Sequence, residues 1–221
     1  MKRNQLLFGI VGIAVVVILV AAYFVFYGSN TGTADSTVDR ANVTITAADR
    51  TLGKKDAPVL MVEYAAPICP HCAHFNETMF PQLKANYIDT GKVYYVFRVF
   101  PLQSADVAAE AIARCLPADN YFQFIDLLFR NQPKWDPENG VQDVHGGLVQ
   151  MGRIAGLSAE QVDRCIGNQA EQQRIAKVGE DATTRYSING TPTFIINGQI
   201  HSTFTNWQEL KDYMDAQLKK S

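Results

Sequence analysis

The first 27 residues differ in pattern from the rest of the chain. Residues 6–27 form an apolar run with no charged or strongly polar side chain. At a helical rise of about 1.5 Å per residue, such a run spans the roughly 30 Å hydrocarbon core of a bilayer. The apolar region of a cleavable signal peptide is usually shorter, about 7–15 residues. We therefore predict a transmembrane signal anchor at 6–27, with cleavage near Ala34 as the alternative.

The charges around this run predict its orientation. Lys2 and Arg3 precede it, and the next basic residue is Arg40. Basic residues stay on the cytoplasmic side of a membrane, so residues 1–5 should be cytoplasmic and the rest exported. In a Gram-negative cell this places the main domain on the periplasmic face of the inner membrane. The Gly-, Ser-, Thr- and Asn-rich stretch after the anchor predicts a flexible tether at 28–41.

Beyond the tether, strand and helix patterns alternate. Runs rich in apolar, β-branched and aromatic residues predict strands at 59–65 and 92–100, with a helix at about 69–86 between them. Strand character returns at 193–197 and again after Asn197-Gly198, a strong hairpin signal. A last amphipathic helix is predicted at about 206–219.

Between the second and third predicted strands, the pattern is helical throughout. Helical periodicity covers 104–116, 120–131, 144–155, 158–166 and 169–186. The order predicts an α/β domain made of residues 42–103 and 187–221. An all-helical subdomain is inserted into that domain at 104–186.

Composition narrows the possible functions. Of the 221 residues 47% are hydrophobic and 19% charged, and the formal net charge is −2. These values exclude a disordered chain and offer no electrostatic attraction for nucleic acid. We expect a monomer that binds no nucleic acid.

The chemistry is concentrated in the sequence CPHC at 69–72. Two cysteines at this spacing can belong to a zinc site, a haem attachment site or a redox pair. Zinc would need a second pair, whereas Cys115 and Cys165 stand far apart. Covalent haem needs a histidine directly after the second cysteine, where Ala73 stands, and His74 has no evident fellow ligand for a metal. We therefore predict a redox dithiol without a metal or cofactor.

The predicted position of Cys69 explains how the pair would work. Cys69 starts a helix, where free backbone N–H groups and the helix dipole stabilise an anion and lower the pKa of a thiol. Pro70 is well suited to the first helical position. His71 can add positive charge or a hydrogen bond. Stabilising the thiolate makes the disulfide a stronger oxidant, and Cys72 is the buried partner that closes it.

These residues resemble a known family. CPHC after a strand that contains an acid, the long helical insertion, and GTPTF at 190–194 before a strand are similar to the DsbA family of thiol:disulfide oxidoreductases. The resemblance runs from about Thr51 to the end of the chain. The segment LGKKDAP at 52–58 is similar to the membrane-anchored branch. The resemblance implies a thioredoxin fold with an inserted helical subdomain.

The resemblance also implies roles for individual residues. Cys69 would be the nucleophile, Cys72 the resolving cysteine and His71 the residue that tunes the thiolate. Pro192 matches the cis-proline that faces the dithiol, and Thr191 matches the position whose backbone pairs with substrate. Glu63 matches a buried acid that assists proton movement at the resolving thiol; the alternative is an edge-strand residue that faces solvent.

Cys115 and Cys165 remain as a second pair. Four cysteines permit three pairings, and a Cys69–Cys72 pair leaves these two to each other. An unpaired thiol beside an oxidase in an oxidising compartment would be a liability. We expect a structural disulfide, with two buried free thiols as the alternative.

Together these features predict an exported enzyme that introduces disulfides into exported proteins by exchange at Cys69–Cys72. Its substrates would be reduced or unfolded exported proteins, and the resemblance implies a DsbB-like membrane partner that reoxidises it. One alternative is a disulfide reductase or isomerase. Another is a chaperone or scaffold that binds exported proteins without using the dithiol.

Overall fold

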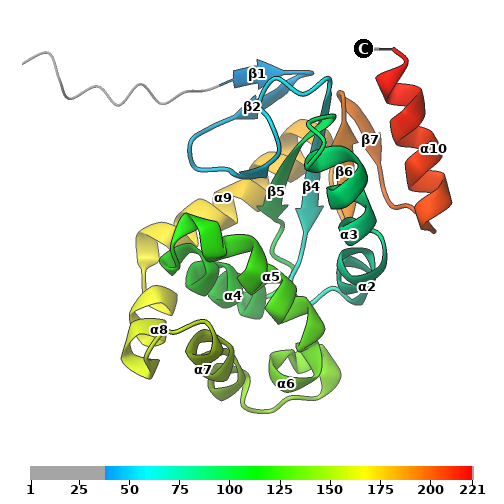
Figure 1. Ribbon diagram of the computed structural model, residues 1–221. Coiled ribbons are helices and arrows are strands. Elements are labelled where there is room, and N and C mark those ends of the chain that lie inside the picture. The colour runs from blue at the N-terminus through cyan, green and yellow to red at the C-terminus, as the bar shows by residue number, and fades with distance from the viewer. Residues whose placement is uncertain (1–37, 221) are drawn as a thin grey trace, which may run out of the picture. The chain divides into compact units, whose positions relative to one another are not determined.

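The sheet is built around two strongly apolar strands, β4 (Val59–Ala65) and β5 (Val93–Val99). In the computed structural model, which describes residues 38–220, they lie at the centre of a five-stranded sheet of order β3-β5-β4-β6-β7 (Figure 1). The other strands are β3 (Arg50–Leu52), β6 (Thr193–Ile196) and β7 (Gln199–His201). β4 and β5 are parallel, and the remaining pairs are antiparallel.

Both faces of β4 are covered, which explains its sequence. Every residue of β4 is buried, as a strand packed on both faces requires. Met61 and Ala65 point into one apolar cluster with residues of the helices that follow β4 and β5. Val62 and Tyr64 point into a second cluster, together with Ala182 of the long helix α9 (Gln169–Tyr186). α9 therefore covers the opposite face of the sheet.

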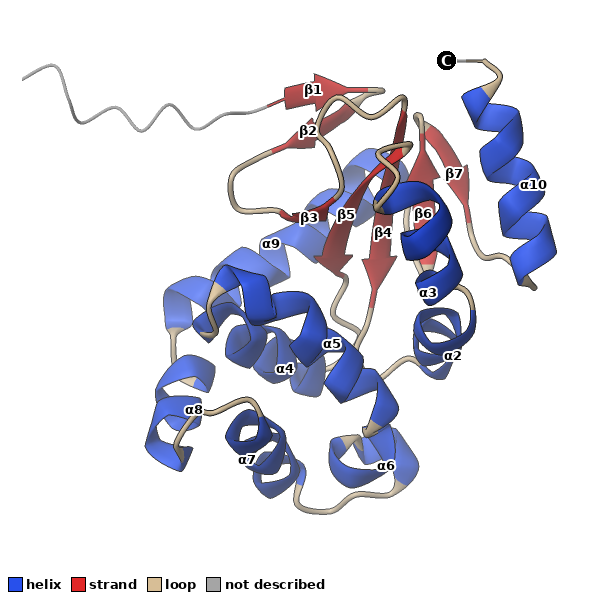
Figure 2. Cartoon of the chain, viewed as in Figure 1, coloured by secondary structure: helices blue, strands red, loops and turns tan. Residues whose placement is uncertain are grey.

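The remaining helices follow the predicted order (Figure 2). After β4 come α2 (Pro70–Thr78), α3 (Phe80–Leu83) and a π-helical turn (Lys84–Ile88). Between β5 and β6 lie, besides α9, the helices α4 (Ser104–Cys115), α5 (Tyr121–Arg130), α6 (Gln132–Trp135), α7 (Val144–Ile154) and α8 (Ala159–Ile166), and the 3₁₀ turns Ala118–Asn120 and Pro137–Asn139. α10 (Trp207–Leu218) follows the β6–β7 hairpin. The thioredoxin-like α/β fold with a block of helices between β5 and β6 is thus confirmed.

Several details differ from the sequence-based expectation, among them β3 and α6, which were not predicted. Residues 38–40, which we assigned to the tether, form β1 (Val38–Arg40), paired antiparallel with β2 (Val43–Ile45). Strands of three residues are too short to show a hydrophobic period. The turn between them has positive φ at Ala41 and Asn42, and of these two residue types only asparagine is a sequence signal for such a turn. The single helix expected at 69–86 is divided, because Pro81 lacks the N–H that would continue α2.

The predicted anchor, residues 6–27, and residues 28–37 of the tether lie outside the described residues. Within residues 38–220, the helices are too short or too polar to cross a membrane.

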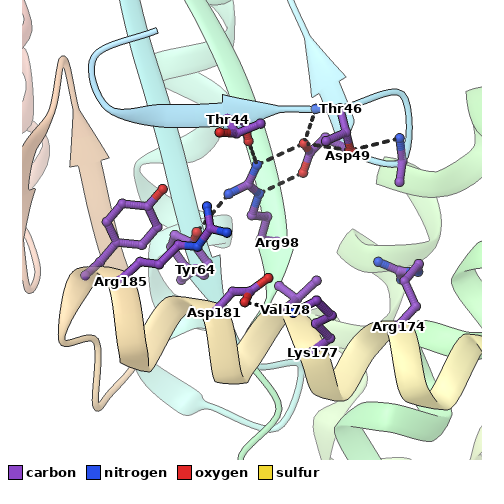
Figure 3. A pocket seen from close by; sticks show the side chains of 12 residues that line it. Thr44, Thr46, Asp49, Tyr64, Arg98, Arg174, Lys177, Val178, Asp181 and Arg185 are labelled. Carbon is purple, nitrogen blue, oxygen red and sulfur yellow. Dashed lines mark hydrogen bonds and ion pairs between the residues drawn. The ribbon is translucent and has the colours of Figure 1, made fainter. Parts of the chain in front are cut away.

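Arg98 of β5 ties the small β1–β2 hairpin region to the sheet (Figure 3). Its guanidinium donates to both carboxylate oxygens of Asp49 at 2.7 and 2.9 Å, to the Tyr64 hydroxyl at 2.8 Å and to the Thr44 carbonyl at 2.7 Å. These contacts line a pocket of about 290 Å³ on the α9 side of the sheet. Because the Arg98 guanidinium is bound to the carboxylate of Asp49, we interpret Arg98 as a structural residue that stabilises the fold.

Candidate active site

The CPHC sequence joins the end of β4 to the start of α2. Cys69 is the N-cap residue of α2, with extended backbone angles, and Pro70 occupies the first helical turn. Pro70 and His71 are exposed, whereas Cys69 is 6% exposed and Cys72 is fully buried. The Cys69 thiol therefore lies just below the protein surface, and the Cys72 thiol lies deeper.

The environment shifts the pKa values of the two thiols in opposite directions. A hydrogen bond from Cys72 lowers the pKa of Cys69 to about 5, with contributions from Thr191 and from the backbone N–H groups of Cys72 and His71. Burial acts against this shift and is outweighed. At Cys72, burial raises the pKa well above its ordinary value, and the hydrogen bond and charge of Cys69 add to that shift. At neutral pH the reduced site thus holds one thiolate and one thiol.

The loop before β6 faces the dithiol. The Thr191–Pro192 peptide bond is cis, and Pro192 is buried. The carbonyl oxygen of Thr191 lies 3.3 Å from Sγ of Cys69, although the two residues are 122 positions apart in the chain. The family resemblance implied that Thr191 and Pro192 lie at the dithiol, and the fold brings them there.

Glu63 lies inside the protein behind the dithiol. Its strand β4 is paired on both sides, by β5 and β6, and the side chain is 2% exposed, which excludes the alternative of a solvent-facing edge residue. The hydroxyl of Tyr95 on β5 donates to Oε2 of Glu63 at 2.6 Å. Burial raises the pKa of Glu63 to about 8, and the Tyr95 hydrogen bond partly opposes that shift.

Two buried side chains of the helical insertion hold the loop that carries Cys69. The carboxylate of Asp106 on α4 accepts hydrogen bonds from the backbone N–H of Ile68 at 2.9 Å and of Leu102 at 2.9 Å. The amide of Gln132 on α6 donates to the carbonyls of Pro67 at 2.8 Å and Cys69 at 3.2 Å. Burial raises the pKa of Asp106 to about 6. Sequence reasoning missed both residues, because neither belongs to a motif.

An open pocket adjoins Cys69. It has a volume of about 450 Å³ and lies between the CPHC loop, the start of α4 and the turn after α6. Leu102, which is 47% exposed, contributes an apolar wall, and Glu138 contributes a carboxylate. The pocket offers space for a peptide beside the reactive sulfur.

The other two cysteines form a disulfide. Cys115 of α4 and Cys165 of α8 are bonded, whereas Cys69 and Cys72 are free. The predicted pairing is therefore confirmed, and the bond lies within the helical insertion. Among residues 38–220, no group of three or more His, Cys, Asp or Glu side chains is arranged to hold a metal ion.

Comparison with known proteins gives consistent matches. A family model described as thioredoxin matches residues 46–216. A putative protein-disulfide oxidoreductase of Rickettsia bellii is 35% identical over 151 residues, which are 68% of this chain and 57% of that protein. This chain therefore spans little more than half the length of that relative. The probable disulfide bond formation protein D of Bacillus cereus is 30% identical over 176 residues, 77% of this chain and 79% of that protein.

A solved structure supports the same relationship. The crystal structure of Wolbachia pipientis alpha-DsbA1 matches with a TM-score of 0.72 and 28% sequence identity, over 79% of this chain and 92% of that chain. Both the sequence match and the fold agree with the resemblance found from the CPHC site. The chain belongs to the thioredoxin family and, within it, to the DsbA-like disulfide oxidoreductases.

Proposed function

We propose that this protein is an exported thiol:disulfide oxidoreductase that introduces disulfides into other exported proteins through Cys69 and Cys72. The observation that carries the proposal is the difference between the two thiols. The pKa of Cys69, which is 6% exposed, is about 5, and the pKa of the fully buried Cys72 is raised. A stabilised thiolate is a good leaving group, and it favours the reduced form of the site.

The reaction follows from this arrangement. A substrate thiolate attacks Sγ of Cys69 in the Cys69–Cys72 disulfide, and Cys72 leaves and takes up a proton. A second substrate thiolate then attacks the substrate sulfur of the mixed disulfide and releases the Cys69 thiolate. The substrate loses two electrons and forms a disulfide, and the protein gains them as a dithiol.

The neighbouring residues have distinct roles in this proposal. Thr191 pairs its backbone with the substrate, Pro192 fixes that loop opposite the dithiol, and His71 and Pro70 shape the start of α2. The pocket beside Cys69 receives the residues that flank the substrate cysteine. Glu63 exchanges a proton with Cys72.

The direction of the reaction favours oxidation. Because the reduced site is stabilised by the thiolate, the disulfide is readily reduced and therefore oxidises substrates. Turnover then requires an electron acceptor, and we assign this role to a membrane partner of the DsbB kind. The anchor at 6–27 would hold the enzyme on the extracytoplasmic face of the membrane, near such a partner. Retention of the full-length protein in membranes washed with high salt tests the anchor, and a soluble product that starts near Asp35 would contradict it.

A peptide oxidation assay tests the proposed activity. The oxidised protein is mixed with a reduced peptide that contains two cysteines, and the peptide disulfide is quantified after acid quenching. We expect one peptide disulfide per protein, and none with Cys69→Ser. If the peptide stays reduced while the wild type and Cys69→Ser both prevent aggregation of an unfolded protein, the chaperone alternative holds instead.

An equilibrium measurement separates oxidase from reductase. The ratio of oxidised to reduced Cys69–Cys72 is measured in glutathione buffers of known composition. We expect the pair to be largely reduced at glutathione ratios that leave a structural disulfide oxidised. A pair that stays oxidised in such buffers would favour a reductase.

A further inference from the structure

The carboxyl group of Glu63 is held by a tyrosine on the neighbouring strand. The hydroxyl of Tyr95 lies 2.6 Å from Oε2 of Glu63, and each side chain is 2% exposed. In the β4–β5 register Tyr95 lies opposite Met61, two residues before Glu63, so both side chains point to the face of the sheet that carries the dithiol. The ionisation of a buried carboxyl group that accepts such a short hydrogen bond depends strongly on the donor.

Packing fixes the position of the Tyr95 hydroxyl. The ring of Tyr95 lies 5.1 Å from that of Phe80 in α3 and 6.1 Å from that of Phe122 in α5, measured between ring centroids. The ring of Tyr95 is therefore enclosed by α3 and by α5 of the insertion. Replacing tyrosine with phenylalanine should remove the hydroxyl while leaving the ring in place.

We propose that Tyr95 is a positioning residue for the proposed thiol–disulfide exchange, and that its hydroxyl holds the Glu63 carboxyl group in place for proton exchange with Cys72. The inference rests on the proposed function and deepens it. Glu63 and Cys72 interact electrostatically, so the charge on one affects the proton on the other. Tyr95 donates its hydrogen bond to Glu63, and we expect it to act on the Cys72 thiol mainly through that contact.

The pKa of Glu63 depends on the groups that face its carboxyl group. Tyr95 faces it from β5, and the charges of Cys69 and Cys72 act from the start of α2. The residue opposite on β6 is the apolar Phe194, and Tyr121 of α5 acts electrostatically on Tyr95. Burial and the Cys69 charge raise the pKa of Glu63, and the Tyr95 hydrogen bond acts in the opposite direction. Without the hydroxyl, Glu63 should stay protonated to a higher pH.

The expected rise in the pKa of Glu63 can be measured through the rate at which the reduced protein is reoxidised. The Cys69 thiolate attacks oxidised glutathione and releases one glutathione thiolate. Cys72 must then lose its proton to attack the mixed disulfide, and the Glu63 carboxylate accepts that proton and passes it to solvent. The second glutathione leaves, so that oxidised glutathione has gained the two electrons that the dithiol lost. The rate of this second step should rise with pH as Glu63 ionises. Cys69 carries no charge in the mixed disulfide, so the midpoint should lie no higher than the pKa of about 8 that Glu63 has beside the Cys69 thiolate.

The test compares two tyrosines in one core. Tyr121 is as deeply buried as Tyr95, and its hydroxyl donates at the same distance, 2.6 Å, to the carboxylate of Glu110 and not to that of Glu63. The second step is followed by rapid acid quench between pH 6 and 10 for the wild type, Tyr95→Phe and Tyr121→Phe. For Tyr95→Phe we expect the midpoint to rise by about one pH unit and the rate at pH 7 to fall about tenfold. For Tyr121→Phe the midpoint should not move.

A second variant shows whether the effect passes through Glu63. In a Glu63→Gln background, Tyr95→Phe should leave the pH profile unchanged. If Tyr95→Phe fails to fold, 3-fluorotyrosine placed at position 95 keeps the ring and makes the hydroxyl a stronger donor, and the midpoint should then fall. With Glu63 present, an unchanged midpoint in Tyr95→Phe or with 3-fluorotyrosine at position 95 overturns the inference, as does an equal shift in Tyr121→Phe. A wild type that forms no mixed disulfide with glutathione would instead overturn the proposed function.

Discussion

Acidification should lower the free energy of unfolding of the reduced protein more than that of the oxidised protein, because only the reduced protein holds the Cys69 thiolate. The pKa of Cys69 is about 5 in the folded protein, against an ordinary value of 9.0. A depressed folded pKa adds stability that is complete above the ordinary pKa and is lost as the pH falls through the folded value. The stability of the reduced form should therefore fall between pH 9 and pH 5.

The magnitude follows from the pKa difference. Each pH unit between the two pKa values changes the free energy of unfolding by about 1.4 kcal/mol, which gives at most ~3 kcal/mol between pH 7 and pH 5. Half of the Cys69 population is still ionised at pH 5, and solvent at the rim of the site screens the charge. We therefore expect a difference of about 2 kcal/mol. A stabilisation of that size corresponds to roughly 40 mV in the reduction potential of the pair.

Urea unfolding of the oxidised and reduced proteins at pH 5 and pH 7 measures this difference. Glu63 and Asp106 also titrate near this range, but they are present in both forms, so their effects largely cancel in the comparison. Cys69→Ala under reducing conditions is the matched control, and its stability should depend on pH as that of the oxidised wild type does. If the two wild-type forms lose the same stability between pH 7 and pH 5, the thiolate does not stabilise the reduced site and the reasoning is refuted.

Three further changes test other parts of the structure. Replacing Cys115 and Cys165 together with alanine should lower the free energy of unfolding by roughly 4 kcal/mol, for a closed loop of 50 residues, while peptide oxidation is kept; loss of oxidation would contradict a purely structural bond. Gln132→Ala should cost about 1–3 kcal/mol and slow alkylation of Cys69 at pH 6, because two loop carbonyls lose their donor; an unchanged alkylation rate would show that the loop needs no such support. Gly53→Ala should lower the melting temperature by several degrees, since a Cβ there would lie 2.3 Å from a carbonyl oxygen of β5 and the φ angle is +83°; an unaltered melting temperature would contradict that contact.

The parts of the fold that could be predicted are those with a repeated pattern. β4 was predicted at its observed bounds, because seven consecutive residues are buried on both faces and only the position of Glu63 breaks the apolar run. The five longer helices of the insertion, α4, α5, α7, α8 and α9, were predicted from amphipathic periodicity, whereas the four-residue α6 was not. β1, β2 and β3 were missed, because three residues carry no measurable period and their pairing depends on residues far away in the sequence.

In the candidate site, too, the residues within a sequence motif could be predicted and the others could not. CPHC and the residues before β6 lie within short motifs, so their association could be expected from the sequence. Tyr95, Asp106 and Gln132 reach the site only through the tertiary fold, from a neighbouring strand and from two helices of the insertion. An apolar strand gives no sign of which tyrosine meets a buried acid, and a glutamine in a helix gives no sign of which carbonyl it will bind.

The chain order of the site has a consequence for when the thiol becomes reactive during biosynthesis. The Thr191 partner of Cys69 is made 122 residues after it, and Gln132, which holds the Cys69 carbonyl, is made 63 residues after it. At about 5–20 residues per second, the ribosome needs roughly 6–24 s to produce the complete set. During that interval Cys69 lacks the contribution of Thr191 to its low pKa, whereas Cys72, which contributes most, follows it by only three residues. The complete surroundings of the reactive thiol therefore form only after the segment that leads into β6 has been synthesised.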